Sequence, residues 1–179
     1  MSYTSHEHAH RFAAWAASSA ASTSKLSRFK VEIGKTILEE AGFGADYLTT
    51  ALPKADEMDS RHAAWRASII AASLKHGCNF THGVAAKLIN VYLKAAFMMA
   101  FHKENLGIEG LHPPIDRTLL KALAEHDEDA VRRRQWRSLE KSGWSKFDSE
   151  RYQGTIDLVR AERRGRPLWT VEEYWRGHQ

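Results

Sequence analysis

The segment HGVAAKLINVYLK, residues 82–94, carries an amine among apolar residues. On a helical wheel of about 100° per residue, Lys87, Asn90 and Lys94 fall on one narrow stripe, and almost every other direction is apolar. A helix that is apolar on nearly all sides lies at the centre of its domain, so its polar stripe must reach water at the outer surface or in a cleft. A lysine with restricted hydration in a cleft is a candidate nucleophile.

The same pattern has a second interpretation, in which Lys87 extends to bulk water and has no further role. Periodicity alone does not distinguish the two. Asp116 has a better defined local role, because Pro113 and Pro114 impose an extended entry and aspartate is a preferred helix N-cap. We therefore predict that Asp116 caps the helix that follows it, and this role is compatible with a catalytic one.

The elements that position these residues are all predicted to be helices. Alanine is abundant, only 4 prolines occur, and β-branched residues seldom cluster. Apolar periodicity, capping residues and terminating glycines place helices at residues 5–21, 25–42, 61–77, 83–102, 117–126, 128–143, 150–165 and 171–178. The chain is predicted to be a single compact all-α domain, residues 1–179, of about seven or eight helices.

Three local features of these helices can be predicted in more detail. Phe12, Trp15 and the alanines are expected on the apolar side of the first helix. The third and fourth helices are expected to form a hairpin with a tight connection, similar to a helix-hairpin-helix element. Thr170 and Glu173 match a capping box that would open the last helix.

Composition excludes several classes of protein. The single cysteine, Cys78, rules out an internal disulfide framework and a four-cysteine iron–sulfur site. The first residues do not resemble a secretory signal, and lysine interrupts the best candidate for a membrane span. We therefore expect a cytoplasmic protein with no membrane partner.

The charge balance favours anionic partners only slightly. The chain has 26 Lys+Arg against 22 Asp+Glu, a formal net charge of +4. Positive charge is concentrated in the last third, at RRRQWR, residues 132–137, and RAERRGR, residues 160–166. Each run fits either a solvated helix face or a contact with phosphates.

A helical hairpin followed by HGVAAK, and then HPPID at the start of a later helix, resembles the helix-hairpin-helix/Gly-Pro-Asp superfamily of DNA glycosylases. Within that superfamily the chain is most similar to the lysine-bearing 8-oxoguanine DNA glycosylases of the compact archaeal type. The similar part covers residues 82–116, and it departs from the family pattern at Ala85, where a second glycine is expected.

This resemblance implies a mechanism. Lys87 would attack the sugar C1′ as the damaged base leaves, forming a Schiff base that can proceed to strand cleavage, and Asp116 would stabilise the positive charge on the sugar. The partner would be damaged duplex DNA, with the target nucleotide flipped out of the helix. No cofactor is implied, and no obligatory protein partner is inferred.

The resemblance also suggests which residues hold the DNA, although core packing is the more common role of a tryptophan and a solvated helix face that of a basic run. The base would be bound by Trp169, Glu172, Trp175 and Asn90. The phosphates would be bound by His82, Gly83, Lys94, Arg132, Arg133 and Arg134.

Two other functions are open. The sequence HEHAH, from His6 to His10, matches the H-E-x-x-H zinc pattern, but no third ligand is indicated and we predict no metal site. The main alternative to an enzyme is a non-catalytic helical module that binds DNA or a protein, in which Lys87 neutralises a phosphate or faces solvent.

Overall fold

The computed structural model describes residues 3–24, 26–98 and 107–177, and within these ranges the chain forms helices and connecting segments without a strand. The predicted all-α class is therefore confirmed. The α-helices are α1 (Ser5–Ala21), α2 (Val31–Glu40), α3 (Met58–Lys75), α4 (His82–Leu93), α5 (Arg117–His126), α6 (Ala130–Ser142) and α7 (Ser149–Arg163). Short 3₁₀ helices are η1 (Ala45–Thr49), η3 (Ile108–Gly110), η4 (Trp144–Lys146) and η5 (Leu168–Tyr174), and η2 (Lys94–Met98) is π-helical.

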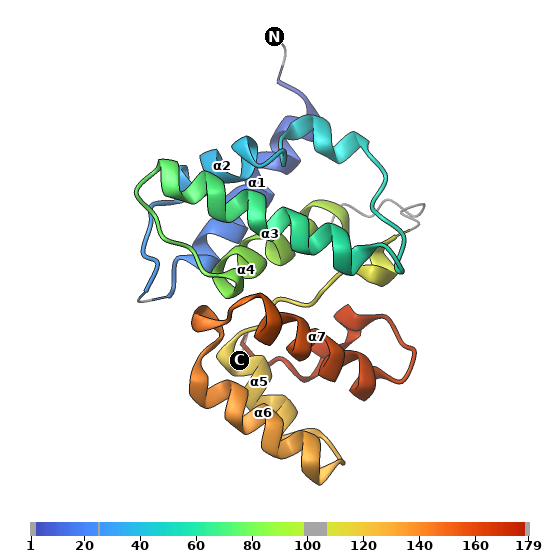
Figure 1. Ribbon diagram of the computed structural model, residues 1–179. Helices are drawn as coiled ribbons and strands as arrows, with labels where there is room; N and C mark the ends of the chain where they lie inside the picture. Colours follow the sequence, from blue (N-terminus) through green and yellow to red (C-terminus); the bar gives the residue numbers. More distant parts are fainter. Residues whose placement is uncertain (1–2, 25, 99–106, 178–179) are drawn as a thin grey trace.

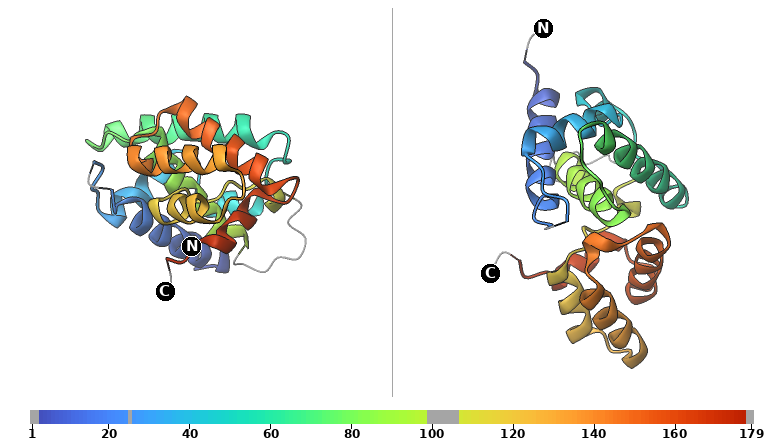
Figure 2. Two further views of the ribbon diagram at one scale, coloured as in Figure 1. Left: turned by 90° about the horizontal axis from the view of Figure 1, so that it is seen from below. Right: turned by 60° about the vertical axis from the view of Figure 1, so that its left-hand side comes forward.

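The helices form two lobes (Figure 1). The first lobe contains α1 to α4, and the second contains α5 to α7 with η5; the right-hand view of Figure 2 shows the same separation. Each lobe has its own cluster of buried apolar residues. Helix α4 is common to both, because Leu88 and Ile89 belong to the first cluster and Ala86 to the second.

Helix α1 packs on α4 through its small residues. Ala13, Ala14 and Ala17 are fully buried, whereas Phe12 and Trp15 are 54% and 55% exposed. The prediction of the apolar side was therefore right for the alanines and wrong for Phe12 and Trp15. A face of alanines allows two helices to approach closely, and here that face is turned toward the core in place of the larger side chains.

Helices α3 and α4 form the predicted hairpin, joined by residues 76–81. Thr81 caps α4 by accepting a hydrogen bond from the amide of Val84 at 3.2 Å. The α-helical hydrogen bonding ends at Leu93, and the chain continues as the π-helical turn η2. The predicted extension of this helix to His102 falls on residues 99–106, which lie outside the described residues.

The caps of the second lobe were predicted with mixed success. Asp116 caps α5 as expected, accepting from the amide of Leu119 at 2.8 Å. The capping box was wrong, because Thr170 lies inside η5 and the carboxylate of Glu173 binds Arg163 and Arg166 instead. The buried guanidinium of Arg163 provides a charged partner for Glu173, and such hydrogen bonds are stronger than one to a neutral backbone amide.

Candidate active site

The structure brings Lys87 and Asp116 together. The Nζ atom of Lys87 donates a hydrogen bond to Oδ2 of Asp116 at 2.8 Å. Lys87 is 7% exposed, so the amine has little contact with water. Because Asp116 begins α5 and Lys87 lies on α4, this ion pair joins the two lobes at one point.

Asp116 is held by more than the lysine. Its Oδ1 atom accepts from the amide of Leu119, and its Oδ2 atom also accepts from Nε1 of Trp175 at 3.1 Å. The ring of Trp144 lies on another side of the amine, 5.9 Å from Nζ of Lys87 to the ring centroid. The carboxylate is therefore fixed in direction, which is a requirement for a group that must act on one atom of a substrate.

The ion pair lies on the wall of a pocket of about 300 Å³ between the lobes. Helices α1 and α4 and the π-helical turn η2 form one side, and the segment before α5, η5 and the residue after it form the other. The lining residues are Ala20, Lys87, Val91, Lys94, Ala95, Pro114, Asp116, Glu172 and Trp175. This volume lies within the range of ligand pockets, and the combination of an apolar wall with a few polar groups is typical of them.

A second ion pair lines the same pocket. Lys94, about two turns after Lys87 on the chain, forms an ion pair with Glu172 of η5. The two pairs together place two amines and two carboxylates on the pocket wall. The pocket therefore offers both donors and acceptors to the edge of a bound molecule, beside the ring of Trp175.

No protein-family model, no curated protein and no solved structure matches this chain. The resemblance to DNA glycosylases is therefore a hypothesis that depends on the motif and on the geometry of this pocket.

Asn90 does not line the pocket, although it shares the stripe of Lys87 and Lys94. It is 2% exposed, and its Nδ2 atom donates to the carbonyl of Pro113 at 2.9 Å and to the hydroxyl of Tyr152 at 3.0 Å. Its Oδ1 atom lies 2.7 Å from Nε2 of His62. All its hydrogen-bonding groups are engaged by the protein, so the predicted contact with substrate is not supported.

The buried side chains around Asn90 form a hydrogen-bond chain in which each group donates to the next. Arg66 can only donate, so Nδ1 of His62 accepts from it at 2.8 Å and Nε2 of His62 donates to Asn90. The hydroxyl of Tyr152 accepts from Asn90 and donates to Nδ1 of His112 at 3.1 Å. Nε2 of His112 then donates to Asp59 at 2.9 Å. Both histidines are neutral in this arrangement.

The same environment shifts the acid–base behaviour of these groups. Burial lowers the pKa of His62 well below its ordinary value of 6.5, and the nearby charge of Arg66 acts in the same direction. Burial also lowers the pKa of His112, although the hydrogen bond to Asp59 opposes this effect. The hydrogen bond from His112, together with Arg160, lowers the pKa of Asp59 to about 2.

These shifts predict a loss of stability in mild acid. A histidine whose folded pKa lies below 6.5 stabilises the fold fully above that pH, and the contribution falls as the pH decreases toward the folded pKa. We expect the free energy of unfolding to fall below about pH 6, by about 1.4 kcal/mol per pH unit from His62, with further contributions of the same sign from His112 and His82, whose pKa values are also lowered. Asp59 stays ionised in this range. Urea unfolding at several pH values measures the slope.

A matched variant assigns that slope. In His62→Gln the amide can accept from Arg66 and donate to Asn90 without titrating, so the contribution of His62 to the slope should disappear. His6→Gln is the control for the substitution itself, because His6 is exposed and lies outside this hydrogen-bond chain. A free energy of unfolding that is constant from about pH 7 to pH 5 would contradict the neutral-histidine arrangement.

The start of α4 is covered by the second lobe. The amide of Gly83 donates to the carbonyl of Phe147 at 3.0 Å, and Thr81 donates through its hydroxyl to the carbonyl of Ser145 at 2.7 Å. A Cβ atom on Gly83 would lie 1.9 Å from the carbonyl oxygen of Trp144. Glycine is therefore required by packing, and its amide is not available to a phosphate.

His82 is also engaged at this end of α4. Its Nδ1 atom accepts from Nε of Arg66 at 3.4 Å. Burial and the charge of Arg66 lower the pKa of His82, which disfavours a positive charge here. The predicted phosphate contacts of His82 and Gly83 are thus not supported by their positions.

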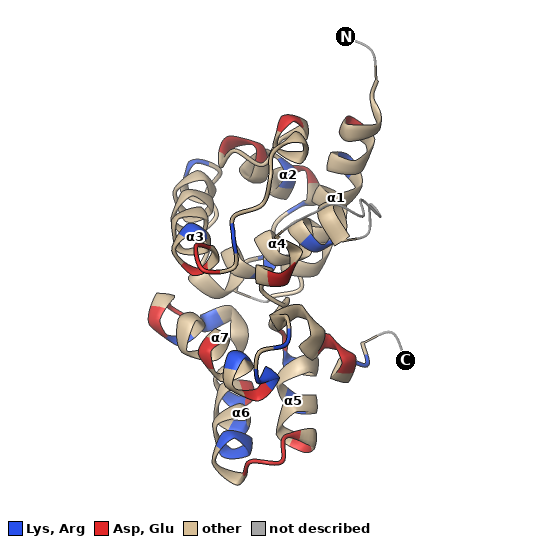
Figure 3. Ribbon diagram, turned by 90° about the vertical axis from the view of Figure 1, so that its right-hand side faces the viewer, with Lys and Arg blue, Asp and Glu red and all other residues tan. Residues whose placement is uncertain are grey.

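The basic run at the start of α6 is divided between structural and exposed roles. Arg132 donates from Nε and Nη2 to the buried carboxylate of Asp127, both at 2.8 Å, and Arg133 donates to the carbonyl of Asp127 at 3.2 Å. Arg134 is exposed. Figure 3 shows that α6 carries several basic residues, while acidic residues are spread over both lobes. Of the three predicted phosphate contacts, Arg134 is the one whose side chain is open to solvent.

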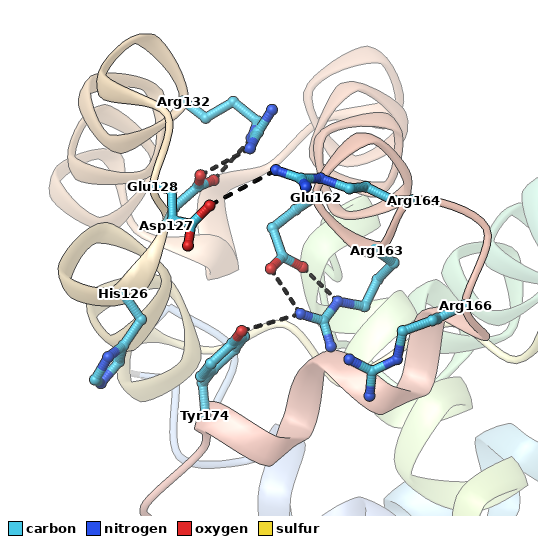
Figure 4. Close-up of a pocket in the computed structure, with 9 residues that line it drawn as sticks. All are labelled: His126, Asp127, Glu128, Arg132, Glu162, Arg163, Arg164, Arg166 and Tyr174. Atoms are coloured by element: carbon cyan, nitrogen blue, oxygen red, sulfur yellow. Dashed lines mark hydrogen bonds and ion pairs between the residues drawn. The ribbon is translucent and has the colours of Figure 1, made fainter.

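A second pocket, of about 290 Å³, lies between the turn from α5 to α6 and the end of α7 (Figure 4). Arg163 of α7 is 3% exposed and lies here beside Glu162 and Tyr174. It also donates to the carbonyl of Thr170 and to the carboxylate of Glu173, at 3.2 and 2.6 Å. Three of these partners belong to η5, so Arg163 holds η5 against α7. Glu172, which lines the pocket of Lys87, also lies on η5.

The remaining predictions concern Trp169, metals and membranes. Trp169 packs partly buried against the first-lobe core, and it does not line the pocket of Lys87. Among residues 3–24, 26–98 and 107–177, no group of three histidine, cysteine or acidic side chains is arranged to hold a metal ion. In the same ranges no helix has the length and apolar character needed to cross a bilayer.

Sequence reasoning missed several residues that shape the site. Trp144 lies beside the amine of Lys87, and Arg163 holds η5. The buried partners of Asn90, which are His62 and Tyr152, were also missed. His112 belongs to the same hydrogen-bond chain and was missed too, although its place directly before Pro113 in the motif HPPID is a signal that could have identified it.

Proposed function

We propose that this protein is a DNA base-excision glycosylase with lyase activity that removes an oxidised purine, such as 8-oxoguanine, through a Schiff base on Lys87. One observation carries the proposal: a nearly buried amine lies 2.8 Å from a fixed carboxylate on the wall of a pocket. A lysine that only neutralised a phosphate would need to reach solvent, whereas Lys87 points to Asp116 at the pocket wall.

The chemistry follows from these two groups. The amine of Lys87, whose ammonium proton has passed to solvent, attacks C1′ of the flipped nucleotide with its free electron pair, while Asp116 remains ionised. The bond from C1′ to the base breaks, and the base leaves with the bonding electrons and takes up a proton. The electron pair of the amine nitrogen then forms the C1′=N bond as the bond between C1′ and O4′ breaks, and O4′ leaves with the bonding electrons and takes up the proton that the nitrogen loses, which gives the imine. Asp116 stabilises the positive charge on the sugar during this step.

The rest of the pocket suits a flat, polar base. Trp175 and the apolar side chains of the wall offer surface to its ring, and Lys94 and Glu172 offer a donor and an acceptor to its edge. An oxidised purine carries both donors and acceptors on its edge, so it can use both members of this pair. Lys94, which is 36% exposed, and Arg134 are the predicted DNA contacts that remain open to solvent.

The test is covalent trapping. Purified protein is incubated with duplex oligonucleotides that carry 8-oxoguanine, an abasic site or no lesion, in the presence of borohydride. We expect an adduct with the damaged duplexes but not with the undamaged one, and peptide mass spectrometry should map it to Lys87. Duplex binding without an adduct on either lesion would reject the lysine mechanism and favour the non-catalytic binding module.

A further inference from the structure

Two side chains of α4 hold the same short segment of chain. Asn90 binds the carbonyl of Pro113, and Lys87, one turn earlier, binds the carboxylate of Asp116. The segment between these contacts begins with two prolines, which restrict its backbone. Its position relative to α4 is therefore defined at both ends.

Asn90 is itself held in one orientation. Its Oδ1 atom accepts from His62 on α3, and its Nδ2 atom is the group that faces the Pro113 carbonyl, which can only accept. The ring of His62 is stacked on Tyr152 of α7, with centroids 5.3 Å apart and planes 9° apart. The amide is thus fixed from both lobes, and rotating it would place acceptor against acceptor at Pro113.

We propose that Asn90 is the positioning residue of the Lys87–Asp116 pair, acting through the Pro113 carbonyl to set where the carboxylate meets the amine. Asn90 touches neither the pocket nor the two reacting groups, so its effect must pass through the backbone of the 113–116 segment. The catalytic part of this inference rests on the proposed glycosylase function. The geometric part concerns the ion pair alone and can be tested without DNA.

The test without DNA measures how fast Lys87 reacts with trace acetic anhydride, by mass spectrometry, relative to the exposed Lys141 in the same sample. Asn90→Asp keeps the acceptor for His62 and removes the donor to both Pro113 and Tyr152. We expect the segment to shift and the amine to be released from Asp116, so that labelling of Lys87 rises about tenfold. Serine is too short to reach Pro113, so Asn90→Ser should also increase the labelling of Lys87. This variant provides the test if Asn90→Asp does not fold.

Two comparisons separate positioning from simple loss of stability. Tyr152→Phe removes a neighbouring bond of the same amide but leaves the contacts to His62 and Pro113, so labelling should stay within about twofold of wild type even if the melting temperature falls. In an Asp116→Asn background the Asn90 substitution should have no further effect, because its action passes through that carboxylate. Labelling that is unchanged in both Asn90 variants would overturn the proposal.

The experiment with DNA tests the catalytic part of the proposal, independently of the labelling experiment. If the wild type forms the Lys87 adduct, Asn90→Asp should slow trapping at saturating DNA by about tenfold to a hundredfold and leave the half-saturating DNA concentration nearly unchanged. Equal losses in Asn90→Asp and Tyr152→Phe would overturn the positioning role. If the wild type forms no adduct, the proposed function fails, and the labelling comparison still decides the role of Asn90.

Discussion

Lys87→Gln is expected to abolish the borohydride adduct completely while the protein remains folded. A glutamine amide has no basic electron pair on nitrogen, so it cannot form a Schiff base. It can still donate a hydrogen bond to Asp116, and that carboxylate keeps its bonds from Leu119 and Trp175. Trapping on an abasic duplex measures the loss, and a urea melt of the same variant shows whether the fold survives.

The partner variant separates two roles of the aspartate. Asp116→Asn retains an oxygen for the amide of Leu119, so α5 remains capped, but the charge beside the amine is lost. We expect the trapping rate to fall by about a hundredfold or more, since a group aimed at developing charge commonly contributes that much. A variant that traps at the wild-type rate would leave Asp116 with its capping role alone.

Lys141→Gln is the matched control for these changes. Lys141 is an exposed lysine near the end of α6, outside the residues that line the pocket. Its removal tests whether adducts form on any accessible amine. An adduct that persists in Lys87→Gln and disappears in Lys141→Gln would reject the buried amine as the nucleophile.

The sequence predicted most of the helices because they carry a local signal, but α2 begins at Val31 and not near residue 25, and the last predicted helix is the 3₁₀ helix η5. The Asp116 cap follows from residue type and the two preceding prolines, and both are local. The burial of Phe12 and Trp15 was predicted wrongly, since periodicity marks a helix but does not show which of its sides meets a neighbour. Alanine gives a weak hydrophobic signal, and in α1 it is the residue that forms the contact.

Periodicity is limited in the same way at the site, where the contacts join residues that are far apart in the chain. The wheel placed Lys87 and Asn90 on one stripe, but their roles differ because their partners come from other helices. Asn90 meets Tyr152, which lies far along the chain, and no pattern within α4 contains that information. Periodicity cannot predict a contact between residues that are far apart in the sequence. The pairing of Lys87 with Asp116 was predicted only from the resemblance.

Arg163 is expected to be the residue of the second lobe whose replacement costs most stability. Burial opposes its charge, but hydrogen bonds to Glu162 and Glu173 outweigh this and raise the pKa of Arg163. Arg163→Met leaves Glu162, itself little exposed, without its partner. Removing one member of a buried ion pair costs about 3–5 kcal/mol, so we expect a loss of that order in the free energy of unfolding.

The consequence should extend to the pocket of Lys87. Arg163 holds Thr170 and Tyr174, and Glu172 lies between them on η5. Arg163→Lys keeps the charge, but one ammonium group cannot span the partners of a planar guanidinium, so we expect an intermediate loss of stability together with slower trapping. Arg164→Lys is the control, because Arg164 is the exposed neighbour, and it should change stability by no more than about 0.5 kcal/mol. Wild-type stability in Arg163→Met would show that the contacts of the guanidinium do not hold η5, and the orientation of Glu172 would then have to depend on its ion pair with Lys94.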